Sequence, residues 1–126
     1  FDYLLVDGFD ADARAGALDT LPFYQACRAR LTDNGVFCVN LLGRNKGFAG
    51  SVERIQAAFA GRVAVFPSCD SGNTIAFATG GEPVEITLQA MRENALRLKK
   101  ESGLDLLPTI SRLQLGHPLP GGVLRI

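Results

Sequence analysis

The stretch FDYLLVD, residues 1–7, decides the fold class. Its centre, Tyr3 to Val6, is apolar at every position, and an unbroken apolar run is typical of a strand covered on both faces in a parallel sheet. A carboxylate, Asp7, follows where this strand should end. We therefore expect an α/β sheet with this strand in its interior, and we expect the elements that flank it to lie upstream of residue 1.

Helical and extended patterns alternate along the rest of the chain. Apolar residues at helical spacing predict helices that begin near Thr20, Phe48 and Pro83. Strands are expected over 36–42, 62–66 and 74–79, and a short helix over 109–114. The connection between the last two strands is too short to hold a crossover helix, so these strands should pair antiparallel. The order predicts two parallel crossovers and then an antiparallel hairpin, as in the C-terminal half of a doubly wound, mostly parallel sheet. We interpret residues 1–103 as this part of a domain and residues 104–126, which are rich in Pro and Gly, as a C-terminal tail.

The composition argues against several classes of partner. Among 126 residues, 13 Lys and Arg balance 13 Asp and Glu, so no basic patch marks a nucleic-acid interface. No apolar run approaches the ~20 residues that cross a membrane, and no signal sequence opens the chain. Three cysteines without a CxxC pair fit neither a disulfide framework nor a zinc site. We therefore expect free thiols, no metal, and a cytoplasmic location.

Two aspartates at the end of the first strand belong to a longer pattern. Asp7 and Asp10 are followed by an aromatic pair, Phe23 and Tyr24, and by Gly35 just before the next strand. This pattern resembles the polyamine aminopropyltransferases, the spermidine synthase family, whose Rossmann-like sheet is shared with S-adenosylmethionine-dependent methyltransferases. The resemblance covers about two-thirds of the chain. The resemblance implies that this chain is the C-terminal half of such a catalytic domain.

The resemblance also implies roles for both aspartates. Asp7 would be the general base, and Asp10 would hold the amine substrate. The residues themselves agree, because an amine with a pKa of about 10 is protonated at neutral pH and must lose a proton before it can attack. A carboxylate at the carboxyl edge of a parallel sheet lies where ligands of open α/β folds bind. The alternative is that Asp7 and Asp10 are ordinary loop residues that cap turns. Asp12 and Asp19 are predicted to be solvated.

The loop over residues 66–73 departs from the family pattern. Where the family has the Tyr that lines its amine site, this chain has Cys69, and the following Pro is replaced by Asp70. The resemblance implies that both side chains face the substrate, so we expect a wider and more acidic pocket. With no His near it in sequence, Cys69 is not expected to be a nucleophile. Arg44 and Lys46 are expected in a solvated surface turn.

These observations predict a spermidine synthase-like transferase of polyamine biosynthesis. Its intact form would move an aminopropyl group from decarboxylated S-adenosylmethionine to a small-molecule amine. The Gly-rich turn and acidic residue that hold the donor in the related fold are absent, so the chain alone should bind no adenosyl cofactor and be inactive. A methyltransferase and a non-catalytic interaction module are the alternatives. An exposed strand edge favours a homodimer.

Overall fold

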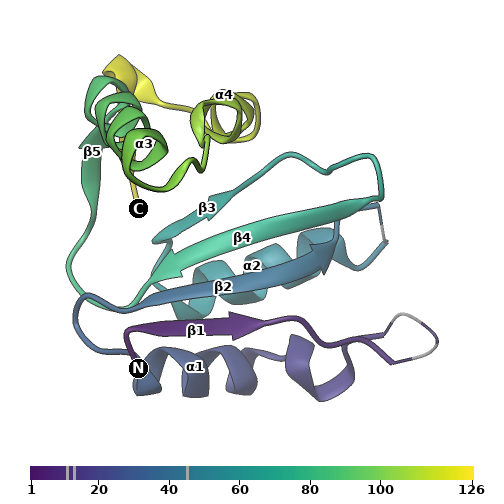
Figure 1. Ribbon diagram of the computed structural model, residues 1–126. Helices are drawn as coiled ribbons and strands as arrows, with labels where there is room; N and C mark the ends of the chain where they lie inside the picture. Colours follow the sequence, from purple (N-terminus) through teal and green to yellow (C-terminus); the bar gives the residue numbers. More distant parts are fainter. Residues whose placement is uncertain (11, 13, 45) are drawn as a thin grey trace.

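The computed structural model describes residues 1–10, 12, 14–44 and 46–126 (Figure 1). Strands and helices alternate through the first part of the chain and give way to two helices near its end. In order, the elements are β1 (Tyr3–Val6), the 3-10 helix η1 (Gly16–Asp19), α1 (Leu21–Arg30), β2 (Val36–Leu42), α2 (Phe48–Ala58), β3 (Val63–Val65), β4 (Asn73–Thr79), β5 (Glu85–Thr87), α3 (Leu88–Ser102), α4 (Leu107–Gly116), the 3-10 helix η2 (Pro120–Gly122) and β6 (Val123–Arg125).

The main sheet has four strands in the order β1-β2-β4-β3. Strand β1 pairs parallel with β2, whereas β4 pairs antiparallel with both β2 and β3. The predicted α/β class and the antiparallel hairpin are confirmed. Strand β4 inserts between β2 and β3, so one of the three pairings is parallel and the sheet is mixed. The predicted doubly wound, mostly parallel arrangement is therefore not confirmed.

Helices α1 and α2 cover one face of this sheet. Four large side chains in this layer are fully buried: Tyr24, Phe37, Ile55 and Phe59. The ring of Phe37 packs edge-on against Tyr24 and stacks on Phe59, with centroid distances of 5.9 and 5.1 Å. Because side chains alternate along a strand, the residues of β2 between the buried ones point to the opposite face. That opposite face is available for a site.

A second unit, formed by α3, α4 and the β5–β6 pair, lies beside β3 (Figure 1). Its core joins Ala64 of β3 to Leu113 of α4 and Leu124 of β6. The predicted long helix before Gly103 is confirmed as α3, but its predicted start near Pro83 was wrong. Residues 85–87 pair with β6, and the Thr87 hydroxyl caps the helix by accepting from the Ala90 amide. Strand β6 was missed because it is short. It pairs with β5 across the predicted boundary at residue 103, and that boundary stays a prediction.

Within the described residues, no helix is both long and apolar enough to cross a membrane.

Candidate functional site

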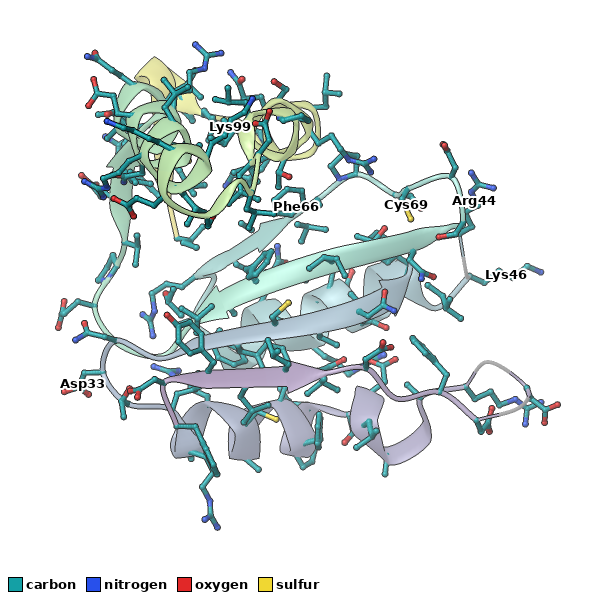
Figure 2. All side chains as sticks on the ribbon, in the orientation of Figure 1. Asp33, Arg44, Lys46, Phe66, Cys69 and Lys99 are labelled. Atoms are coloured by element: carbon teal, nitrogen blue, oxygen red, sulfur yellow. The ribbon has the colours of Figure 1, made fainter. Side chains whose placement is uncertain are left out.

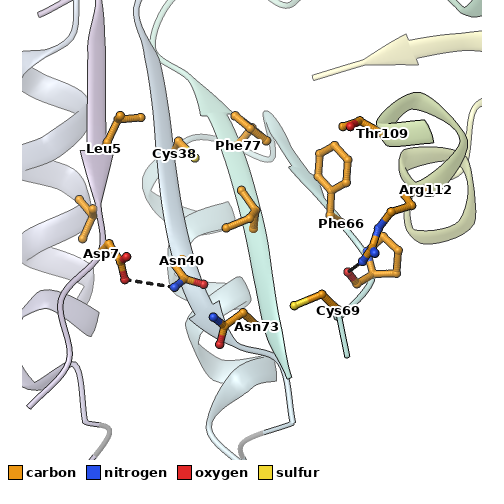
Figure 3. Close-up of a pocket in the computed structure, with 13 residues that line it drawn as sticks. Leu5, Asp7, Cys38, Asn40, Phe66, Cys69, Asn73, Phe77, Thr109 and Arg112 are labelled. Carbon is orange, nitrogen blue, oxygen red and sulfur yellow. Dashed lines mark hydrogen bonds between the residues drawn. The ribbon is translucent and has the colours of Figure 1, made fainter. Parts of the chain in front are cut away.

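A pocket of about 610 Å³ opens on the sheet face that α1 and α2 leave uncovered (Figure 3). Strands β1, β2 and β4 form its floor, the loop after β3 forms one wall, and α4 closes one side. Most of its lining is apolar. The lining residues are Leu5, Val6, Asp7, Cys38, Asn40, Phe66, Pro67, Cys69, Asn73, Ile75, Phe77, Thr109 and Arg112.

Asp7 brings a carboxylate to this pocket. Strand β1 ends at Val6, which pairs with Val39, so the next residues in register are Asp7 and Asn40. The Asn40 side-chain amide Nδ2 donates a hydrogen bond to Asp7 Oδ1 at 3.1 Å. The Asp7 side chain is otherwise exposed. A carboxylate held on one side and open on the other can bind a cation or accept a proton.

Cys69 reaches the pocket from a tight turn. The amide of Gly72 donates to the Cys69 carbonyl and the amide of Cys69 donates to the Asn73 carbonyl, both at 2.8 Å. Gly72 has a φ of +90°, which an L side chain rarely adopts. The Ser71 hydroxyl, 2.9 Å from Cys69 Sγ, lowers the pKa of this thiol below its ordinary value. The turn therefore aims an acidified thiol at the pocket.

The pKa values of the other two thiols, Cys27 and Cys38, are shifted in the opposite direction. Burial raises the pKa of Cys38, which also lines the pocket, and of Cys27, which α1 places in the core. All three cysteines are free, as the sequence predicted.

Arg112 contributes the positive charge of the pocket from α4. Its Nη2 donates to the Pro67 carbonyl at 3.2 Å. Figure 3 shows Asp7 and Arg112 on opposite sides, separated by the strands of the floor. Among the described lining residues these two are the charged ones, so the lining is balanced in charge. Asp70 lies exposed in the turn and is not among these lining residues, so the more acidic pocket stays a prediction.

The remaining sequence candidates lie outside the pocket lining. The Asp10 carboxylate caps its own loop, where Oδ1 accepts from the backbone amides of Asp12 and Arg14 at 2.9 and 2.8 Å. Arg44 and Lys46 are exposed near the turn that carries Cys69, as predicted (Figure 2). The structure thus brings Asp7 and Cys69 into one pocket and leaves Asp10 and Asp70 outside its lining. The catalytic and substrate-binding roles of all four stay predictions.

Sequence reasoning gave no role to Asn40 or Arg112. A signal for Asn40 was present, because it is the polar residue that interrupts the apolar run of β2. Arg112 carried no such signal. It lies in a segment read as a tail, and only the packing of α4 near β3 brings it to the pocket.

A second cluster, under the other face of the sheet, corrects the reading of Asp19 as solvated. Asp19 Oδ1 accepts from the Tyr24 hydroxyl at 2.8 Å, and Oδ2 accepts from Ser51 Oγ at 2.7 Å and from Arg54 Nη2 at 2.6 Å. Burial and the Asp19 carboxylate together raise the pKa of the Tyr24 hydroxyl. This carboxylate joins η1, α1 and α2 and has a structural role.

Comparison with curated proteins agrees with the residue pattern. The chain is 32% identical over 120 residues to polyamine aminopropyltransferases from a serogroup A and a serogroup B strain of Neisseria meningitidis, a match that covers 95% of this chain and 46% of each relative. It is also 32% identical over 125 residues to a polyamine aminopropyltransferase of Chromobacterium violaceum, with 99% and 48% covered. The resemblance to the polyamine aminopropyltransferases is confirmed. The chain spans about half the length of the curated relatives it matches. No protein-family model matches it.

Proposed function

We propose that the intact protein is a spermidine synthase-like aminopropyltransferase and that the pocket on the open sheet face binds its amine acceptor. The mixed sheet would then be half of a doubly wound Rossmann-like sheet. The observation that carries the proposal is the Asp7 carboxylate, which faces the pocket and is held by Asn40. The names of the curated relatives support the reaction class.

The lining suits an aliphatic amine. Leu5, Ile75 and Phe77 from the sheet and Phe66 from the adjoining loop present apolar surface along which methylene groups can lie. An ammonium group would sit at the Asp7 end, where the opposite charge is. At the other end, Arg112 would disfavour a second ammonium group by like-charge repulsion.

The reaction needs one proton transfer and one displacement. Asp7 takes a proton from the bound ammonium, which frees the lone pair of the amine nitrogen. That lone pair attacks the methylene carbon next to the sulfonium of decarboxylated S-adenosylmethionine, so an N–C bond forms as the C–S bond breaks. The C–S electron pair stays on sulfur, which leaves as a neutral thioether. Asp7 then releases its proton to water.

Replacement of Asp7 by Asn tests this proposal in the intact protein. The substitution keeps the shape and removes the base, so turnover of an amine with decarboxylated S-adenosylmethionine should fall by about 100-fold or more. Asp12→Asn, an exposed carboxylate nearby, is the matched control and should keep parental turnover. An Asp7→Asn variant as active as the parent would remove Asp7 from the mechanism.

Product analysis by mass spectrometry separates the rival functions. An aminopropylated amine supports the proposal. A methylated product would assign a methyltransferase, and transfer of neither group by the intact protein would leave an interaction module.

We also propose that the 126-residue chain by itself forms a homodimer through β1, the edge that the rest of the sheet would cover in the intact protein. This strand lies at one edge of the described sheet, with Tyr3 74% exposed, and an uncovered edge of this kind pairs readily with another chain. In analytical ultracentrifugation, Tyr3→Lys should shift the protein toward monomer because an edge lysine blocks strand pairing. Leu115→Lys on α4, where Leu115 is 82% exposed, is the control and should leave the dimer intact. A parent that is monomeric at high micromolar concentration would contradict the proposal.

A further inference from the structure

The pairing of β1 with β2 places the side-chain amide of Asn40 beside Asp7, the proposed base. Leu5 pairs with Cys38 and Val6 with Val39, and Asp7 and Asn40 are the residues that follow this last pair in sequence. Paired residues of neighbouring strands point to the same face, so Asp7 and Asn40 both line the pocket. Among the side chains that the structure describes, Asn40 is the hydrogen-bond partner of Asp7.

That hydrogen bond fixes the orientation of the Asn40 amide and leaves its oxygen without a partner. Because Nδ2 donates to Asp7 Oδ1, Asn40 Oδ1 must point away from the carboxylate. Within the described part of the chain this oxygen is buried and accepts no hydrogen bond. A buried acceptor without a partner destabilises the folded state, because it loses water without a replacement.

The surrounding strand makes an asparagine at this position unfavourable for folding. The neighbours of Asn40 on the same face of β2 are Cys38 and Leu42, and every other residue of the strand is apolar. A leucine here would match these neighbours and remove the unpaired oxygen. A residue that destabilises the fold and also contacts a reactive group is usually retained because it has a functional role.

We infer that Asn40 is a positioning residue for the proposed reaction: it clamps Asp7 Oδ1 so that Oδ2 faces the amine, at the expense of fold stability. The inference rests on the proposed function of the pocket. With Oδ1 engaged by the amide, Oδ2 is the oxygen left to take the proton from the ammonium. A carboxylate free to rotate would spend much of its time in other orientations, and proton transfer needs close alignment.

Asn40→Leu in the intact protein tests the inference, because stability and activity should change in opposite directions. The melting temperature should stay the same or rise, since the unpaired oxygen is gone. The kcat should fall about 10-fold while KM for the amine changes less than about threefold, because the charge of Asp7 still attracts the ammonium. Asn40→Gln, which retains an amide donor, should recover part of the lost kcat. Unchanged kcat in Asn40→Leu would overturn the inference, as would a marked loss of stability.

Thr79→Val is the matched control for the stability effect. Thr79 Oγ1 is likewise buried without a partner in the described chain, but Thr79 lies outside the pocket lining. Its replacement by the isosteric valine should also leave stability equal or higher, with parental kcat and KM. A fall in kcat similar to that of Asn40→Leu would show a general effect of removing buried polar atoms and would overturn the inference.

A spectroscopic measurement separates this inference from the proposed function. In the ¹H–¹⁵N spectrum, the side-chain amide signals of Asn40 should move in Asp7→Ala, because their acceptor is lost. This readout does not need turnover, so a protein that transfers no aminopropyl group can still show that Asn40 holds Asp7. Unmoved Asn40 signals in Asp7→Ala would overturn the clamp even if the protein is an active transferase.

Discussion

Asp7 and Asp19 are both carboxylates in the first twenty residues, and the fold uses them in different ways. Asp19 receives hydrogen bonds on both oxygens from Tyr24, Ser51 and Arg54, and its side chain is 24% exposed. Within the described residues, Asp7 receives one side-chain hydrogen bond, on Oδ1, and opens into the pocket. A carboxylate whose oxygens are all engaged stabilises the structure, whereas one with a free oxygen at a pocket remains available for chemistry.

Removal of the Asp19 carboxylate should have the largest effect on stability. Asp19→Ala leaves Tyr24, Ser51 and Arg54 without their common acceptor, so the free energy of unfolding should fall by about 2 kcal/mol; partial exposure of the ion pair limits the loss. Urea denaturation measures it. Asp12→Ala, at an exposed carboxylate, should stay within about 0.5 kcal/mol of the parent.

The free energy of unfolding of Asp7→Asn, measured in the same way, tests whether the two aspartates have separate roles. This variant should lose activity and keep its free energy of unfolding within about 0.5 kcal/mol, because its one hydrogen bond is exposed. A loss of stability in Asp7→Asn as large as in Asp19→Ala would show that both carboxylates are structural.

Local sequence patterns predicted the position of Asp7 correctly, whereas they predicted Asp19 wrongly as a solvated residue. The apolar run that ends at Asp7 places it at the end of a strand, and the short link between the last two strands predicts the hairpin that carries Cys69. Asp19 depends on partners far away in sequence. Ser51 and Arg54 reach it from α2, more than 30 residues later, and no local pattern encodes that contact.

The C-terminal segment shows the same limit. Residues 104–126 contain prolines and glycines that suggest a tail, yet Leu124 is buried and β6 pairs with β5. The pairing joins two stretches of three residues each, too short for an alternating pattern to stand out. Arg112 enters the pocket only because this unit packs on β3.

An effect at alkaline pH isolates one hydrogen bond of the Asp19 cluster, the bond from Tyr24. Burial and the adjoining carboxylate raise the pKa of Tyr24 above the value of about 10 that an unfolded chain has. The folded state therefore holds this proton more tightly than the unfolded state does. The stabilisation is complete below about pH 10 and is lost as the pH rises beyond it, by at most ~1.4 kcal/mol per pH unit.

Tyr24→Phe should remove that dependence. Near neutral pH the variant should be about 1 kcal/mol less stable, because the hydrogen bond to Asp19 is gone and its oxygen loses a donor. Above pH 10 the difference should shrink, since phenylalanine has no proton to lose. Urea denaturation at pH 7 and at several pH values above 10 measures the difference in stability and its decrease.

Tyr3→Phe, at a ring that is 74% exposed, should have the stability of the parent at all these pH values. A constant difference between Tyr24→Phe and the parent at all these pH values would mean that Asp19 and the buried ring do not hold the proton, and the contrast with Asp7 would then rest on hydrogen-bond geometry alone.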